Sequence, residues 1–131
     1  MKFKFIIIIT LMIFNACQPA KEIFGTFSDI FKLVNEISKK YNEEVNIRVR
    51  NKSYMNIGLI NSNRKDLPGP EKERIARDIA IYAFKHYKKA SDLSQVSVTF
   101  VVSKNFLIFH YNNAMDNYTF DINDLHEELS D

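Results

Sequence analysis

The chain has 131 residues, enough for one domain with a modest core, and its formal charge of +2 comes from 18 basic and 16 acidic residues. A single cysteine excludes a disulfide framework, and three glycines are too few for a glycine-rich phosphate-binding loop. The charges show no concentrated basic surface, so no nucleic-acid partner is expected.

Residues 1–16 have the organisation of a secretory signal peptide. Lys2 and Lys4 precede an almost unbroken apolar run from Phe5 to Phe14. A membrane-spanning helix needs about 20 apolar residues, and this run is roughly half as long, so a cleaved signal is favoured over a span or a buried helix. Loss of Lys2 and Lys4 leaves 16 basic and 16 acidic residues, a neutral mature chain.

Phe14, Asn15, Ala16 and Cys17 resemble the lipobox of bacterial lipoproteins, with Phe14 and Asn15 departing from the usual aliphatic and small residues. The resemblance implies that Cys17 becomes the first residue of the mature protein and carries thioether-linked and amide-linked acyl chains. Two or more chains hold a protein stably on a bilayer. Residues 17–25 are then the lipidated cysteine and its tether. The alternative is an ordinary free thiol at Cys17.

Location follows from the same resemblance. A lipoprotein of this kind is bound to a membrane of the bacterial cell envelope. In the sorting rule of some diderm bacteria, aspartate after the cysteine retains the protein in the inner membrane. Gln18 stands at that position, which favours the outer membrane.

Residues 26–131 are expected to form one domain that begins with a helix and a hairpin. The apolar face of the helix, spaced by three and four residues, comprises Phe27, Ile30, Phe31, Val34, Ile37 and Tyr41. Thr26 or Ser28 is its expected N-cap. Residues 45–49 and 54–59 then alternate between apolar and polar side chains, which predicts two antiparallel strands joined at 51–53.

The second half is expected to contain a long helix, three strands and a short helix. Pro70 fits the first position of a helix that ends near Lys89. Strands are predicted over residues 96–103, 106–111 and 118–122, with a loop at 112–117, and Asn123 is the expected cap of a last helix. The order α-β-β-α-β-β-β-α favours an α+β two-layer sandwich. Its mainly antiparallel sheet would have about five strands and two main helices on one face.

No catalytic constellation is evident. His86, His110 and His126 have no paired spacing, and His86 and His110 are each expected to be an ordinary, partly buried histidine. No serine lies in a nucleophile-elbow motif. No cofactor and no metal are expected. The chain is therefore more consistent with a non-catalytic protein, and the enzymatic alternative is a small periplasmic hydrolase or metal-dependent enzyme that uses His86, His110 or Asp121.

Two surfaces are candidates for contact with a partner. The first is the polar loop 61–69, in which Arg64 and Lys65 are expected to be exposed. The second is a sheet face expected to carry Tyr54, Leu107, Phe109 and Tyr111, unless the last helix covers it through Leu125 and Leu129. These grounds favour a lipid-anchored, non-catalytic binding or assembly module. An inhibitor or immunity-type partner of another envelope protein is the second non-enzymatic alternative.

Overall fold

The computed structural model describes residues 24–106 and 109–130, with the backbone alone at 105, 106 and 109–111. The signal peptide, the lipobox and Cys17 lie outside the described residues. An N-terminal helix over residues 24–41 is followed by β1 (Glu44–Arg50), β2 (Tyr54–Ile60), α2 (Gly69–His86), a 3-10 turn η1 (Ala90–Asp92), β3 (Gln95–Phe106), β4 (Phe109–Asp121) and α3 (Ile122–Ser130). The α+β class is confirmed.

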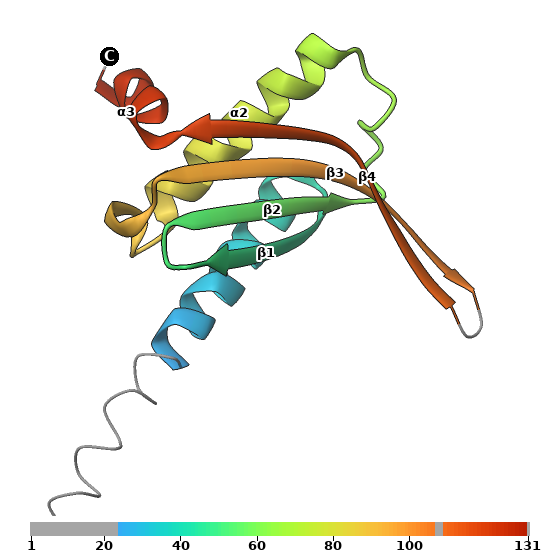
Figure 1. The fold of residues 1–131 in the computed structure, drawn as a ribbon, viewed down its shortest axis with the longest axis horizontal. Coiled ribbons are helices and arrows are strands. Elements are labelled where there is room, and N and C mark those ends of the chain that lie inside the picture. Colours follow the sequence, from blue (N-terminus) through green and yellow to red (C-terminus); the bar gives the residue numbers. More distant parts are fainter. Residues whose placement is uncertain (1–23, 107–108, 131) are drawn as a thin grey trace, which may run out of the picture.

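The four strands form one mixed sheet in the order β1-β2-β3-β4 (Figure 1). The predicted β1–β2 hairpin is confirmed as antiparallel, with Arg50 opposite Tyr54. β2 and β3 are parallel, which requires a crossover connection, and α2 supplies it. β3 and β4 are again antiparallel, so two of the three pairings have the predicted direction.

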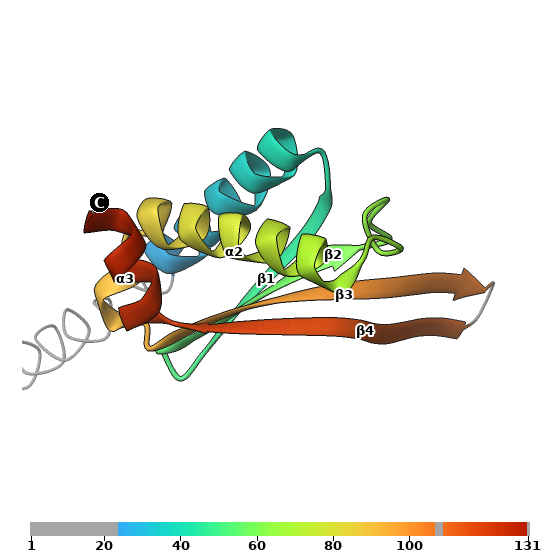
Figure 2. The ribbon, with the colours of Figure 1, turned by 90° about the horizontal axis from the view of Figure 1, so that it is seen from above.

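The prediction of about five strands is wrong, because β4 is one continuous strand where two strands and a loop were expected. Asn112 and Asn113 favour loops, but here they pair with Ser103 and Val102 of β3. A register shift lies between Phe100 and Val101 of β3. Pairing with β2 ends at Ile60, so the remainder of β3 and β4 projects as a two-stranded ribbon (Figures 1 and 2). Lys104, Asn112 and Asn113 of this ribbon are exposed.

All helices of residues 24–106 and 109–130 lie on one side of the sheet (Figure 2). Alternate strand residues pack against them, and this core contains Ile57, Val98, Phe100, Ala80 and Leu125, all with 0% exposure. The predicted packing of the first two main helices on one face is thus confirmed. Leu125 and the half-buried Leu129 of α3 belong to the same core, so α3 does not cover the opposite side of the sheet. We call that opposite side the helix-free face.

The predicted apolar face of the N-terminal helix is confirmed in part, because Ile37 is buried and Ile30, Val34 and Tyr41 pack against the core. Leu33 and Ile37 are its buried residues, whereas Phe27 and Phe31, both expected in the core, are 73% and 64% exposed. The expected caps Thr26 and Ser28 lie inside the helix.

The cap of α3 also differs from the prediction. The Asn123 N–H donates to Asp121 Oδ1 at 2.9 Å, so Asp121 and not Asn123 is the N-cap.

Candidate binding face

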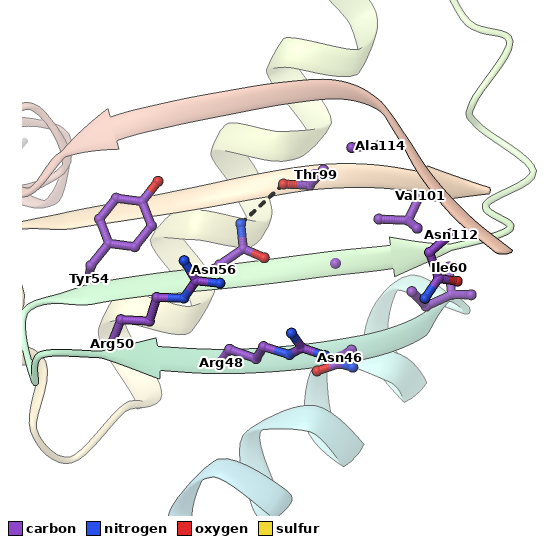
Figure 3. Close-up of a pocket in the computed structure, with 11 residues that line it drawn as sticks. Asn46, Arg48, Arg50, Tyr54, Asn56, Ile60, Thr99, Val101, Asn112 and Ala114 are labelled. Carbon is purple, nitrogen blue, oxygen red and sulfur yellow. Dashed lines mark hydrogen bonds between the residues drawn. The ribbon is translucent and has the colours of Figure 1, made fainter. Parts of the chain in front are cut away.

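A shallow depression of about 440 Å³ lies on the helix-free face (Figure 3). Residues of all four strands line it: Asn46, Arg48, Arg50, Tyr54, Asn56, Gly58, Ile60, Thr99, Val101, Asn112 and Ala114. Side chains alternate along a strand, so these lining residues point away from the helices, and their neighbours in the same strands point into the core. The depression is therefore a direct product of the alternation that builds the core.

The floor of the depression is a network of polar side chains. Asn56 Nδ2 donates to Thr99 Oγ1 at 3.1 Å (Figure 3). It also donates to Ser97 Oγ at 2.7 Å. The Thr99 hydroxyl in turn donates to Asn117 Oδ1 at 2.8 Å, which extends the network from β2 to β4. Ser97 is fully buried and Thr99 is 8% exposed. A part-buried network with its partners in place holds its side chains in fixed positions, so the floor is ordered and polar.

Two arginines stand at the β1 side of this floor. Arg48 lies opposite Asn56 and Arg50 opposite Tyr54, so the four side chains are cross-strand neighbours on one face. Both arginines are exposed, and neither forms an ion pair with an acidic side chain of the described residues. A guanidinium offers five N–H donors in a planar fork that matches a carboxylate or phosphate. This edge can therefore bind an anionic group beside the aromatic ring of Tyr54.

The sequence predicted one residue of this face and missed the others. Tyr54 was expected on an exposed sheet face, and it lines the depression half-buried. Arg48, Arg50 and Asn56 were identified only as the solvated alternation of a hairpin. Their place in one binding face depends on Thr99, which the parallel pairing of β2 and β3 brings beside Asn56. No local pattern in the sequence contains that pairing.

Phe109 and Tyr111, also expected on the sheet face, lie in β4, where their backbones pair with Phe106 and Lys104. Their side chains, and residue 107, are outside the described part of the chain.

Arg64, expected to be exposed on the polar loop, is held by the fold. Its Nη1 donates to Glu43 Oε1 at 2.7 Å and to the Tyr41 carbonyl at 2.8 Å. The Ser62 hydroxyl donates to the same Glu43 oxygen at 2.8 Å. The Glu43 side chain is only 4% exposed and that of Arg64 37%. This cluster ties the loop to the end of the N-terminal helix, which gives Arg64 a structural role.

Lys65, the second residue expected on that loop, is half-buried, and its carbonyl accepts from Lys72 Nζ at 3.2 Å. Lys72 also donates to Asp116 Oδ2 at 2.5 Å and has a side chain with 11% exposure. The hydrogen bond to Asp116 raises the pKa of Lys72, and the opposing effect of burial is smaller. Lys72 therefore stays charged and fastens the loop and β4 to the start of α2.

The histidines whose side chains the structure describes, His86 and His126, are exposed, so the expectation that His86 is partly buried is wrong. Both contact aromatic rings of the helical layer. The His86 ring stacks on Tyr82 with centroids 4.0 Å apart, and its Nδ1 lies 2.8 Å from the Tyr82 carbonyl oxygen. His126 packs edge-on against Phe84 with centroids 4.9 Å apart. The side chain of His110 is outside the described part, and Asp121 caps α3. Within the described residues, no group of three histidine, cysteine or acidic side chains is arranged to hold a metal ion.

Comparison of the chain with protein-family models, with curated proteins and with solved structures found no match. Among the helices of residues 24–106 and 109–130, none combines the length and the apolar character that crossing a membrane requires.

Proposed function

We propose that this protein is a lipid-anchored, non-catalytic binding module of the bacterial cell envelope. Acyl chains on Cys17 attach it to the membrane, with Gln18 favouring the outer membrane over the inner one. The support for the anchor is the signal-like segment and the lipobox-like residues before Cys17. The support for binding is the helix-free face, where a fold of this size leaves a polar depression open to solvent.

A single observation carries the binding proposal, namely that Arg48 and Arg50 are exposed, unpaired and adjacent to Tyr54. Arginine and tyrosine are the residue types most enriched at the energetic centres of protein interfaces. Their neighbours Asn56 and Thr99 are already fixed by hydrogen bonds, so little side-chain entropy is lost when a partner docks on them. The partner with matching chemistry is an envelope protein that presents carboxylates to the arginines.

The inhibitor or immunity-type function uses the same face and differs in its target. If the bound partner is an enzyme or toxin whose activity falls on binding, the module is an inhibitor. If the partner is a structural envelope component, the module serves assembly. The identity of the partner therefore decides between the two.

The anchor is tested by replacing Cys17 with serine in the full-length chain. We expect unprocessed precursor and loss of acylation, as measured by labelled fatty-acid incorporation, because a lipobox requires the thiol. An unchanged mature form with unchanged membrane fractionation would contradict the anchor.

The binding face is tested by a photocrosslinking amino acid at position 54 in cells. We expect an adduct with an envelope protein that is lost in the Arg48→Ala, Arg50→Ala double variant. The matched control is Arg74→Ala, because Arg74 is an exposed arginine of α2, 69% exposed, on the other side of the sheet. An adduct that survives in the double variant, or that Arg74→Ala abolishes equally, would reject this face as the binding site.

A further inference from the structure

The N-terminal helix exposes a stripe of three phenylalanines. Phe24, Phe27 and Phe31 are 76%, 73% and 64% exposed, and their spacing of three and four residues puts them on one side of the helix. Leu33 and Ile37 occupy the opposite, core-facing side. Isolated exposed apolar residues are common, but a contiguous patch of large ones indicates an interaction site.

The stripe continues into a groove beside the sheet. Phe27 and Phe31 line a groove of about 310 Å³ between this helix and β1, together with Ile30, Val34 and the edge-strand residues Val45 and Ile47. The start of the helix extends past the β1 edge of the sheet (Figure 1). Neither the sheet nor α2 can cover the stripe there, so its occupant must come from outside the described domain.

Lysines border the same end of the helix. Lys88 Nζ lies 2.8 Å from Asp29 Oδ1, and Lys89 Nζ donates to Thr26 Oγ1 at 2.8 Å. The pairing with Lys88 neutralises Asp29, whose side chain has 16% exposure and lies on the side of the helix opposite the phenylalanines. These lysines fasten the core-facing side of the helix to the residues after α2 and leave the phenylalanine side exposed. Exposed aromatic side chains on one side of a helix are characteristic of helices that lie in the membrane interface, where the rings enter the acyl boundary.

The distance from the anchor limits where the stripe can be. Six residues, 18–23, separate Cys17 from Phe24. Even a fully extended chain spans at most about 3.6 Å per residue, so Phe24 lies within about 25 Å of a lipidated Cys17. The stripe itself extends only about 10 Å further along the helix. Tethering at this range raises the effective concentration of the bilayer next to the stripe.

We propose that Phe24, Phe27 and Phe31 insert into the headgroup and acyl boundary of the membrane that holds Cys17, and thereby orient the domain on its surface. This inference rests on the proposed lipid anchor and adds a second contact to it. The occupant is the lipid surface itself, selected by its proximity to the anchor through the six residues 18–23.

Single-tryptophan variants test this contact directly, because the chain contains no tryptophan. Full-length Phe27→Trp and Phe31→Trp proteins are purified from membranes and reconstituted in phosphatidylethanolamine–phosphatidylglycerol vesicles, with and without brominated acyl chains. The matched control is Met115→Trp, because Met115 is an exposed large apolar residue, 48% exposed, on β4. We expect blue-shifted emission and strong quenching by the brominated lipid at positions 27 and 31, and water-like, unquenched emission at position 115.

Three other outcomes would overturn the proposal, and they differ in what they leave standing. Water-like emission at positions 27 and 31 in a protein that floats with the vesicles rejects the stripe and keeps the anchor. Blue-shifted emission that brominated lipid does not quench assigns the stripe to a second copy or another protein. Failure of the lipid-carrying full-length protein to float with the vesicles rejects the anchor and the stripe together.

Discussion

Truncation of Arg64 to alanine is expected to destabilise the domain by about 2 kcal/mol. The guanidinium donates one hydrogen bond to the Glu43 carboxylate at 2.7 Å and one to the Tyr41 carbonyl at 2.8 Å. The Glu43 side chain is only 4% exposed. Exposed ion pairs contribute about 0–1 kcal/mol, and removal of one partner from a buried pair costs about 3–5 kcal/mol. The Arg64 side chain is 37% exposed, so solvent screening places this pair between the two limits.

Urea denaturation of the soluble chain from Gln18 onward measures this cost. The midpoint is expected to fall with an unchanged m-value, because the surface exposed on unfolding is the same. Arg74→Ala is the control: its ion pair with Asp78, at 3.3 Å, joins two exposed side chains and is expected to change stability by less than about 0.5 kcal/mol. A double-mutant cycle with Glu43→Gln isolates the pair from the other contacts of Arg64.

Equal costs for Arg64→Ala and Arg74→Ala would refute the reasoning, because they would show that water or Ser62 satisfies Glu43 without the arginine. The same variant tests the assignment of the loop. If Arg64 is structural, the folded fraction of Arg64→Ala retains the photoadduct at position 54. Loss of the adduct in folded protein would return Arg64 to the binding surface.

Three further predictions concern the core, a turn and the response to pH. Leu125→Ala is expected to cost about 3 kcal/mol in urea denaturation because the side chain has 0% exposure, and the half-buried Leu129→Ala should cost less; the reverse order would contradict the packing of α3. Lys52→Gly is expected to raise the free energy of unfolding by roughly 0.5 kcal/mol, since Lys52 has φ 61° in the hairpin turn and glycine adopts this region without a steric penalty; a fall would contradict this. Burial raises the pKa of Tyr41 and Tyr87 above their ordinary 10.0, so the folded state retains protons that the unfolded chain releases. The contribution of these two tyrosines to the free energy of unfolding is complete below pH 10 and declines above it. Tyr87→Phe should therefore reduce the fall of the denaturation midpoint between pH 10 and 11, and an unaltered fall would contradict the assignment.

The elements with a strong local pattern were predictable, and the errors arose where two patterns were equally good. On the N-terminal helix, Phe24, Phe27 and Phe31 are spaced by three and four residues, and so are Ile30, Leu33 and Ile37. Periodicity cannot tell which of two overlapping stripes faces the core, because that choice depends on how the helix is placed against the sheet. The sequence interpretation mixed the two stripes and assigned Phe27 and Phe31 to the interior.

The candidate site was harder to predict than the fold because its residues meet only through non-local pairing. Alternation alone identified Arg48 and Arg50 as solvated, and this is correct. It could not show that Thr99 would lie beside Asn56, since a parallel β2–β3 pair depends on the crossover by α2. The prediction of a loop at 112–117, in β4, failed for a related reason. Asn112 and Asn113 have low strand propensity, and their cross-strand pairing with β3 overrides it.

The two proposed contacts are compatible because they lie mainly on opposite sides of β1, and only Asn46 and Ile60 line both hollows. Val45 and Ile47 of β1 line the groove beside the phenylalanine stripe, whereas Arg48 and Arg50 line the helix-free face. Side-chain alternation sends these pairs to opposite sides of the same strand. A bilayer in contact with the stripe would therefore leave the arginines directed away from the lipid, where a protein partner can reach them. It follows that Arg48→Ala with Arg50→Ala should abolish the adduct at position 54 without changing lipid quenching at position 27, and loss of both signals together would show that the two surfaces are not independent.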